Sequence, residues 1–315
     1  MYGISDLHLH LDGSLRPSTV VDLSAKAGLA VPKDLLFQPG MGLAAALARF
    51  SYTLSLLRTP AAVRRVASEI CEDAAQDGVT DLEIRFAPQL HLDEPARAAG
   101  FTEAAILDAA LVGVRRRAGV IVCGIYGEEP EILEMLVELA ATRSGIVGVD
   151  LAGGPTPLHR RHMVDYQSAF RQAARLGLGR TVHAGEGRPP SEIRAAIEVL
   201  GAQRIGHGTT LLADESVAAL VRESGVVMEV CITSNVHTGV IAQPSLHPLP
   251  SWLQQGIRAT ICTDNTLLSD VTASSEYALA RSLPGMTDAM AAQLVSHGHA
   301  ARFHRFSPIA TAAQP

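Results

Sequence analysis

The sequence predicts an α/β protein of the (β/α)8 barrel, or TIM barrel, class, and three observations support this prediction. Eight short apolar segments alternate with segments of helical periodicity along the 315 residues. Short strands with nearly continuous apolar character are typical of a parallel sheet covered by helices. Imidazole or carboxylate side chains follow five of the eight predicted strands, at the end where barrels of this class carry their chemistry.

The first predicted strand, residues 4–13, carries two histidines that point the same way. His8 and His10 are two positions apart, and side chains alternate along a strand, so three leucines take the opposite face. Two imidazoles in this arrangement suit Zn²⁺ and similar ions, although an isolated pair is as typical of half-buried histidines. Asp12 follows at the strand exit, and Gly13 stands where the chain must turn.

The remaining elements follow in order along the chain. Ser18 is predicted to cap a helix at 19–27, which Gly28 ends. Further strands are predicted at 79–86, 120–126, 146–151, 180–183, 204–207, 226–231 and 259–263. Further helices are predicted at 42–57, 60–76, 102–118, 129–141, 163–176, 190–200, 214–223, 249–255, 274–282 and 287–303.

The main alternative fold is a doubly wound sheet. That fold would need a glycine-rich phosphate turn after the first strand, and the HLHLDG segment has none. Composition does not break along the chain, so we expect a single catalytic domain over residues 1–306. The tail at 307–315, which contains alanine and proline, is expected to be disordered.

Composition argues against several classes of partner for this chain. The net charge is −6 and there is no basic run, which argues against nucleic acid. No run of 18 apolar residues predicts a membrane span. The four cysteines form no CxxC pair, and the N-terminus enters a strand directly without room for a signal peptide. We therefore expect buried, reduced thiols in a cytoplasmic protein.

Polar residues at the predicted strand ends form the candidate site. The segment 150–154 ends the fourth strand, and the segment 231–235 ends the seventh. At the ends of the fifth, sixth and eighth strands the polar residues are His183, Glu186, His207, Asp264 and Asn265. Seven other histidines are expected to be surface or structural groups: His159, His162, His237, His247, His297, His299 and His304. The sequence leaves the role of His91 open.

These residues predict a site for one metal ion. Three imidazoles and a carboxylate (His8, His10, His183 and Asp264) leave an open position for water, as in a catalytic zinc site. A two-metal site in such a barrel usually needs a carboxylated lysine, and the chain's only lysines, Lys26 and Lys33, follow the first strand. His207 remains free to orient a hydroxide and Glu186 to act as an acid.

Seven motifs together resemble the adenosine deaminase family of the amidohydrolase superfamily. They are LHLHLDGSLRP (7–17), LEIRFAP (82–88), GVDLAGG (148–154), HAGEG (183–187), RIGHG (204–208), EVCITSNVHTG (229–239) and CTDNTLLS (262–269). They occur in the family's order and span nearly the whole chain. The resemblance implies one zinc ion per chain, held by His8, His10, His183 and Asp264.

The resemblance also implies roles for the remaining residues. Asp264 would take the proton from the attacking water, Glu186 would protonate the purine at N1, and His207 would position the hydroxide. His10, Asp12, Gly153 and Asn265 would contact the substrate, Gly153 at purine N3 and Asp12 at the ribose 5′-hydroxyl. The helix at 43–57, with Leu47 and Phe50, would form an apolar lid, although an ordinary core-facing stripe would look the same.

The expected reaction is zinc-dependent hydrolytic deamination of adenosine, or a close 6-aminopurine nucleoside, to the 6-oxopurine product and ammonia. One alternative is a 5′-modified nucleoside of the aminodeoxyfutalosine or 5′-deoxyadenosine type, and another is a purine-binding barrel without catalysis. Asn265 departs from the family, many of whose members carry a second aspartate there. We expect its amide to donate to purine N7, the alternative being that it caps the turn.

Overall fold

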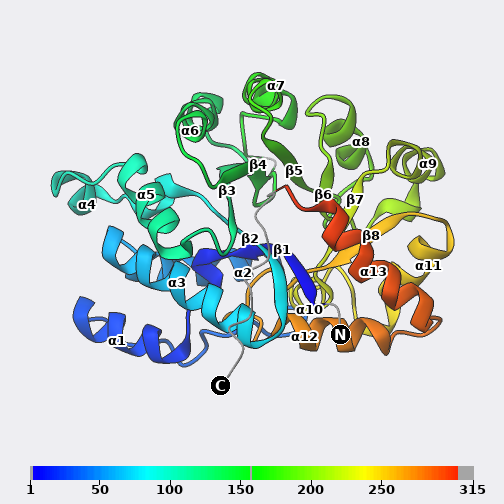
Figure 1. Ribbon diagram of the computed structural model, residues 1–315, viewed down its shortest axis with the longest axis horizontal. Coiled ribbons are helices and arrows are strands. Elements are labelled where there is room, and N and C mark those ends of the chain that lie inside the picture. Colours follow the sequence, from blue (N-terminus) through cyan, green and yellow to red (C-terminus); the bar gives the residue numbers. More distant parts are fainter. Residues whose placement is uncertain (1–2, 157, 304–315) are drawn as a thin grey trace.

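The computed structural model describes residues 3–156 and 158–303, in which eight parallel strands pair in sequence order from β1 to β8 (Figure 1). The ring closes where Leu9 pairs with Asp264. The His10 amide donates to the Asp264 carbonyl at 2.7 Å, and the Asp264 amide donates to the His8 carbonyl at 2.8 Å. The prediction of a (β/α)8 barrel is confirmed.

The elements alternate as the sequence predicts. The strands are β1 (Ile4–His10), β2 (Val79–Phe86), β3 (Gly119–Ile125), β4 (Ile146–Ala152), β5 (Gly179–Ala184), β6 (Arg204–His207), β7 (Val227–Val230) and β8 (Arg258–Ile261). The helices are α1 (Pro17–Ala27), α2 (Leu43–Leu56), α3 (Pro60–Gln76), α4 (Glu94–Ala98), α5 (Glu103–Val114), α6 (Pro130–Ala141), α7 (Gln167–Arg175), α8 (Ser191–Glu198), α9 (Glu215–Ser224), α10 (Ile232–His237), α11 (Leu249–Gln254), α12 (Ala273–Arg281) and α13 (Asp288–Ala301).

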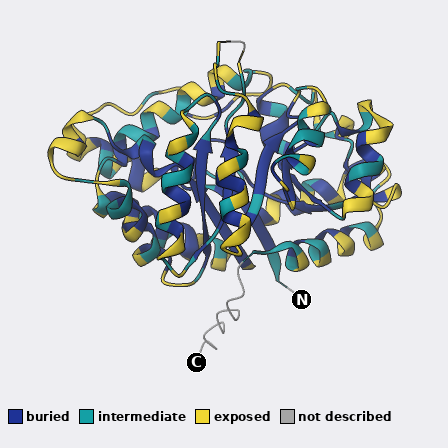
Figure 2. Ribbon diagram, turned by 90° about the horizontal axis from the view of Figure 1, so that it is seen from above, coloured by how far each residue is buried: buried dark blue, intermediate teal, exposed yellow. Residues whose placement is uncertain are grey.

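The apolar core lies between the strands and the surrounding helices. Figure 2 shows buried strands enclosed by helices that bury one face and expose the other. The core cluster joins strand residues such as Ile84 and Val182 to helix residues such as Leu136 and Phe170. This layering is what an amphipathic helix on a parallel sheet requires.

The interior of the barrel, by contrast, contains charged side chains. Arg85 on β2 reaches Asp150 on β4 and Glu229 on β7, at 2.9 Å each, so its side chain crosses the barrel. Arg204 on β6 lies 2.7 Å from both Glu83 and Glu229. These five residues are buried, and pairing offsets the cost of removing their charges from water.

Two element boundaries differ from the prediction near the N-terminus. The first strand ends at His10 rather than residue 13, and a 3₁₀ turn, η1 (Leu11–Gly13), follows it. Helix α1 starts at Pro17 after Arg16, not after Ser18, because proline's fixed φ is already helical and its missing amide needs no partner at the first position.

Other differences come from backbone conformation that periodicity does not reveal. Helix α5 ends at Val114 rather than 118, since Arg115 and Arg116 take left-handed φ values of 48° and 61°. The helix predicted from 163 starts with a 3₁₀ turn, η3 (Met163–Tyr166). Strand β8 ends at Ile261 rather than 263. The short helices α4 and α10 were not predicted, because five or six residues carry too little periodicity.

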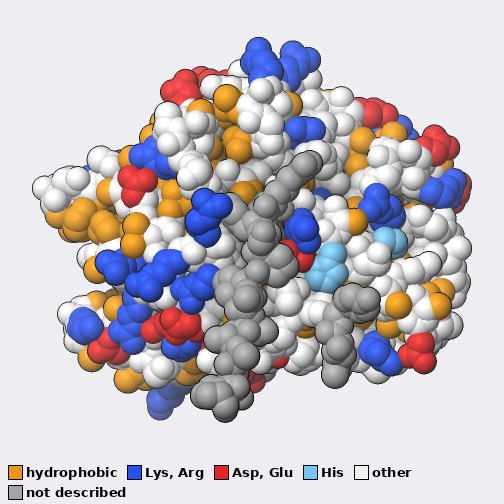
Figure 3. Space-filling view, in the orientation of Figure 1, with side chains coloured by type: hydrophobic (Ala, Val, Ile, Leu, Met, Phe, Trp, Pro, Cys, Tyr) orange, Lys and Arg blue, Asp and Glu red, His pale blue; other side chains and the backbone are white. Residues whose placement is uncertain are grey.

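The surface mixes charges of both signs. Figure 3 shows Lys and Arg side chains gathered over α1 and α3, with acidic side chains among them. Arg16 pairs there with Glu72 and Asp73, and Arg65 with Glu69. Within residues 3–156 and 158–303, no helix is both long and apolar enough to span a membrane. The tail predicted at 307–315 lies outside the described residues.

Candidate active site

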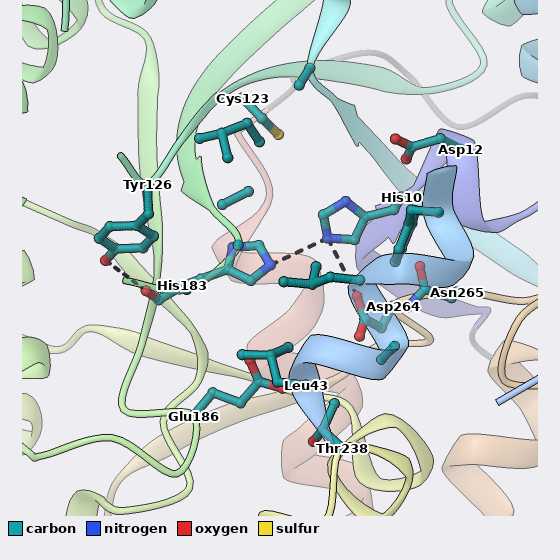
Figure 4. Close-up of a pocket in the computed structure, with 18 of the residues that line it drawn as sticks. His10, Asp12, Leu43, Cys123, Tyr126, His183, Glu186, Thr238, Asp264 and Asn265 are labelled. Atoms are coloured by element: carbon teal, nitrogen blue, oxygen red, sulfur yellow. Dashed lines mark hydrogen bonds and ion pairs between the residues drawn. The ribbon is translucent and has the colours of Figure 1, made fainter. Parts of the chain in front are cut away.

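A cavity of about 360 Å³ opens at the carboxyl ends of the strands (Figure 4). The chain after β1 contributes Asp12, the chain after β4 contributes Gly153, and the chain after β5 contributes Glu186. Six further predicted site residues complete the set: His10, His183, His207, Asp264 and Asn265 also line the cavity, and His8 lies buried beside them. The structure therefore brings every predicted site residue to one place.

Five side chains of this set form a tight cluster. One ligand atom from each of His8, His183, His207 and Asp264 lies within 4.8 Å of the others. His10 joins them, with Nε2 3.3 Å from His183 Nε2 and 3.4 Å from Asp264 Oδ1. His8 Nε2 is buried and makes no hydrogen bond, as expected for a nitrogen that ligates a metal ion. The donor set fits a zinc-like ion.

Two buried carboxylates fix the rings of His8 and His183. His8 Nδ1 lies 2.7 Å from Glu229 Oε2, and His183 Nδ1 lies 3.0 Å from Asp150 Oδ2. A carboxylate only accepts, so each Nδ1 carries a proton, and in the neutral ring each Nε2 keeps a lone pair. Both Nε2 atoms are therefore in the form that binds metal.

Arg85 links these two carboxylates by an ion pair to each. Burial alone would raise the pKa of Asp150, but His183 and Arg85 lower it well below its usual range. The same holds for Glu229, whose pKa is lowered mainly by Arg85 and Arg204 against the effect of burial. The roles of Arg85 and Glu229 were not predicted from the sequence. Their signal was present, as charged residues inside otherwise apolar strands.

His207 and Asp264 take backbone conformations that are costly for residues with a Cβ. Their φ values are 66° and 63°, in the left-handed region. Such strain concentrates at functional sites. His207 Nδ1 lies 3.0 Å from Asn235 Nδ2, and the Ser234 hydroxyl donates to Asp264 Oδ2 at 2.5 Å. Helix α10, which was not predicted, carries both partners.

The electrostatics of the cluster favour uncharged His10 and His207, whereas the carboxylates of Asp264 and Glu229 raise the pKa of His8 against the effect of burial. Burial lowers the pKa of His207 to about 4 and lowers that of His10 well below its ordinary value. Burial alone would raise the pKa of Asp264, but His8, whose Nε2 lies 3.4 Å from Asp264 Oδ1, and the neighbouring histidines hold that pKa well below the usual range. Neutral imidazoles next to a carboxylate are the protonation states that metal binding needs.

Glu186 lies in the loop after β5, close to the metal-type cluster. Glycines on both sides, Gly185 and Gly187, take φ values of 67° and 64°, so the loop turns sharply at this point. The Glu186 side chain is only 4% exposed and lies on the cavity wall. Arg188 Nη1 is 3.9 Å from its carboxylate.

Two polar groups on the cavity wall lack partners among the described residues. Asp12 is 5% exposed, its Oδ1 makes no hydrogen bond, and burial raises its pKa to about 7. Asn265 Oδ1 also makes none and packs against Gly13, where an added Cβ would lie 2.0 Å away. Asn265 therefore does not cap a turn through this oxygen. Gly153, with φ 76°, lies in the loop after β4.

Helix α2 covers the mouth of the cavity. Figure 4 shows it crossing beside the cluster, with Leu43 directed toward the cavity. Five of its side chains line the cavity: Leu43, Ala46, Leu47, Phe50 and Leu54. The Phe50 ring lies 6.1 Å from that of His10. The stripe predicted from the sequence thus faces a cavity rather than a closed core.

Several other histidines are also buried. Of the surface or structural histidines that the sequence predicts, His237 and His247 are only 8% and 3% exposed and are therefore not surface groups. His159 lines the cavity. His91, whose role the sequence left open, is fully buried beside Phe86. Its Nδ1 lies 3.1 Å from the Leu57 carbonyl, which can only accept, so Nδ1 carries the proton and donates it. These depths follow from tertiary packing and have no signature in spacing.

Comparison with known proteins gives consistent matches. The family model described as "Adenosine deaminase" matches residues 4–307. An adenosine deaminase of Clostridium kluyveri is 34% identical over 298 residues, covering 87% of this chain and 81% of the relative. The N6-methyl-AMP deaminase of Arabidopsis thaliana superposes with a TM-score of 0.83 at 25% identity, covering 96% of this chain and 93% of the other. A zinc-bound amidohydrolase of Burkholderia ambifaria superposes with a TM-score of 0.84 at 24% identity, covering 96% and 86%.

Proposed function

Because the chain belongs to the adenosine deaminase family and is thus a hydrolase acting on a C–N bond, we propose that it deaminates adenosine or a close 6-aminopurine nucleoside. The products would be the 6-oxopurine nucleoside and ammonia. The observation that supports this most is the cavity itself, which combines a metal-type cluster, a buried glutamate and an apolar cover. A flat aromatic substrate and a hydrolytic reaction both need that combination.

The metal in this proposal is one zinc ion per chain. His8, His10, His183 and Asp264 would hold it, because His8 and His183 present unprotonated Nε2 atoms and His10 lies against both neighbours. When bound, such an ion lowers the pKa of water from ~15.7 to ~7 and so supplies hydroxide at neutral pH.

The protein's own residues would then carry out the proton transfers. Asp264 takes the proton released by the attacking water and passes it to the leaving amino group, which departs as ammonia. Glu186 protonates purine N1, which removes ring aromaticity as the oxygen adds to C6, and recovers a proton from that oxygen as the 6-oxo group forms. His207 donates to the attacking oxygen and holds it in place. Gly153 and Asn265 would bind purine N3 and N7.

The cavity wall favours a nucleoside over a nucleotide. No Lys or Arg occurs among the described residues that line the cavity, and the partly buried Arg188 beside it is already 3.9 Å from the Glu186 carboxylate. Asp12 would instead meet the ribose 5′-hydroxyl, which can donate to its free Oδ1. A 5′-deoxynucleoside would leave that buried oxygen without a partner, at a cost of roughly 1–3 kcal/mol. Adenosine is therefore preferred to both.

A substrate panel with metal analysis tests this function. Ammonia release would be measured with adenosine, 5′-deoxyadenosine, AMP and adenine, and zinc would be measured in the same preparation. We expect the highest kcat/KM with adenosine and one zinc per chain, and His183→Ala should lose both metal and activity. Preference for AMP would contradict the reading of the cavity wall, and two metals per active chain would contradict the single-ion site.

A further inference from the structure

A chain of hydrogen bonds leads from a backbone amide to His207 through two side chains outside the cavity wall. Its links are Leu249 to His247, His247 to Asn235, and Asn235 to His207. His247 is 3% exposed and Asn235 is fully buried, so water does not compete along the chain. Each link can be given a direction from the chemistry of its donor.

The direction starts at Leu249, whose backbone amide lies 3.1 Å from His247 Nδ1. A backbone N–H can only donate, so His247 Nδ1 must accept and carries no proton. Burial lowers the pKa of His247 to about 3, so the ring is neutral and holds a single proton. That proton is on Nε2.

The direction passes next through Asn235. His247 Nε2 is 3.4 Å from Asn235 Oδ1 and donates to it, which fixes the orientation of the side-chain amide. Asn235 Nδ2 then lies 3.0 Å from His207 Nδ1. An amide nitrogen only donates, so His207 Nδ1 accepts, and the proton of the neutral ring stands on its free nitrogen, Nε2.

We propose that Asn235 and His247 are positioning residues that hold His207 in the Nε2–H form. In this form His207 gives a hydrogen bond to an oxygen in the cavity and has no lone pair for a metal. His8 and His183 take the opposite tautomer, because carboxylates hold their protons on Nδ1. The inference deepens the proposed function and rests on it for its catalytic consequence.

The tautomer is measured directly by nitrogen-15 NMR on the metal-free protein labelled in histidine. The signals of His207 are identified by their loss in His207→Asn. We expect the wild-type proton on Nε2 and a mixture of tautomers in His247→Leu, where the Asn235 amide can turn over. Asn235→Asp has the same shape but only accepts, so it should move a proton to Nδ1. A wild-type proton on Nδ1 would overturn the proposal.

Kinetics on the metal-loaded protein provide the second readout. We expect His247→Leu to lower kcat for adenosine about tenfold, with KM within about twofold and metal content unchanged, and His247→Gln, which can accept and donate at the same places, to recover most of kcat. His297→Leu, which loses a histidine bonded to the Ala259 backbone away from the cavity, is the matched control.

The two readouts separate the two hypotheses. Wild-type kcat in His247→Leu, or a loss of kcat with the His207 tautomer unchanged, would refute the positioning role. Absence of deaminase activity in the wild-type protein would refute the proposed function, while the NMR result on the metal-free protein would still decide the tautomer. Asn235→Asp serves the same test where His247→Leu does not fold.

Discussion

At the scale of single residues, the site depends on which nitrogen of each histidine carries the proton. Glu229 and Asp150 accept from Nδ1 of His8 and His183, whereas Asn235 donates to Nδ1 of His207. Residues of one type are thus set to opposite tasks by the partner behind each ring. Only neighbours that lie far away in sequence make this distinction.

Glu186→Gln tests the proposed acid at this scale. An amide of the same shape cannot give up a proton, and a general acid typically contributes ~10²–10⁴-fold in rate. We expect kcat for adenosine to fall by about that factor while metal content and ligand affinity remain. Glu198→Gln, a surface glutamate paired with Arg194 on α8, is the matched control. Near-normal turnover by Glu186→Gln would exclude it as the proton donor.

Asn265 provides a second test through the substrate. Its amide nitrogen donates at any pH. Loss of its hydrogen bond to purine N7 in a dry pocket would cost roughly 1–3 kcal/mol. 7-Deazaadenosine lacks the N7 acceptor, so we expect its kcat/KM to be lower than that of adenosine by about tenfold or more. Asn265→Leu should remove the difference between the two compounds. Equal turnover of both by the wild-type protein would refute the N7 contact.

At the scale of elements, α2 separates the cavity from water. Its apolar stripe lines the cavity, while Leu47 on the same helix is still 42% exposed. An apolar helix face that is only partly covered gains further burial when a flat ligand fills the space below it. We therefore expect helix α2 to exclude water from the cavity when a substrate binds beneath it.

Phe50→Ala tests this role of α2. The truncation removes a ring that contacts both His10 and Phe37 across the cavity mouth. Burying a phenylalanine side chain is worth about 1.5–3 kcal/mol, of which we assign part to the substrate contact. We expect KM for adenosine to rise by roughly tenfold, with a smaller change in kcat. Val112→Ala, half exposed on α5, is the control, and an unchanged KM in Phe50→Ala would show that the helix does not contact substrate.

At the scale of the whole molecule, one buried ion network connects the strands around the barrel. Arg85 joins β2 to β4 and β7, and Arg204 joins β6 to β2 and β7. Two carboxylates of this network, Glu229 and Asp150, are the ones that orient His8 and His183. Barrel integrity and ligand geometry are consequently held by the same side chains.

Arg85→Met tests that coupling. The substitution keeps the length of the side chain but leaves Asp150 and Glu229 with one partner fewer in the interior. Breaking a buried pair in this way typically costs about 3–5 kcal/mol. We expect the free energy of unfolding, measured by denaturant titration, to fall by about the same amount. Zinc content should fall as well. Arg194→Met removes an exposed pair and should change stability by less than about 0.5 kcal/mol. A similarly small effect of Arg85→Met would show that the network is not needed.

The sequence by itself determined the order of the barrel and most of the site. Periodicity located all eight strands. Their order around the barrel follows the sequence, because a chain of alternating strands and helices has few other ways to form a parallel sheet. The motif residues follow strand ends, and parallel strands bring those ends to one rim, so His8, His183, Glu186 and Asp264 could be grouped without coordinates. Membership of the family, and hydrolysis of a C–N bond, followed from the same motifs.

Only the tertiary structure decided what stands behind those residues. Arg85, Asn235 and His247 act across the barrel or across a loop, and no spacing along the chain encodes contacts of 2.9–3.4 Å between such remote side chains. The left-handed conformations of His207 and Asp264 were equally hidden, since tertiary contacts hold them against local preference. Local pattern is set by neighbours in sequence, whereas proton position and strain are set by neighbours in space.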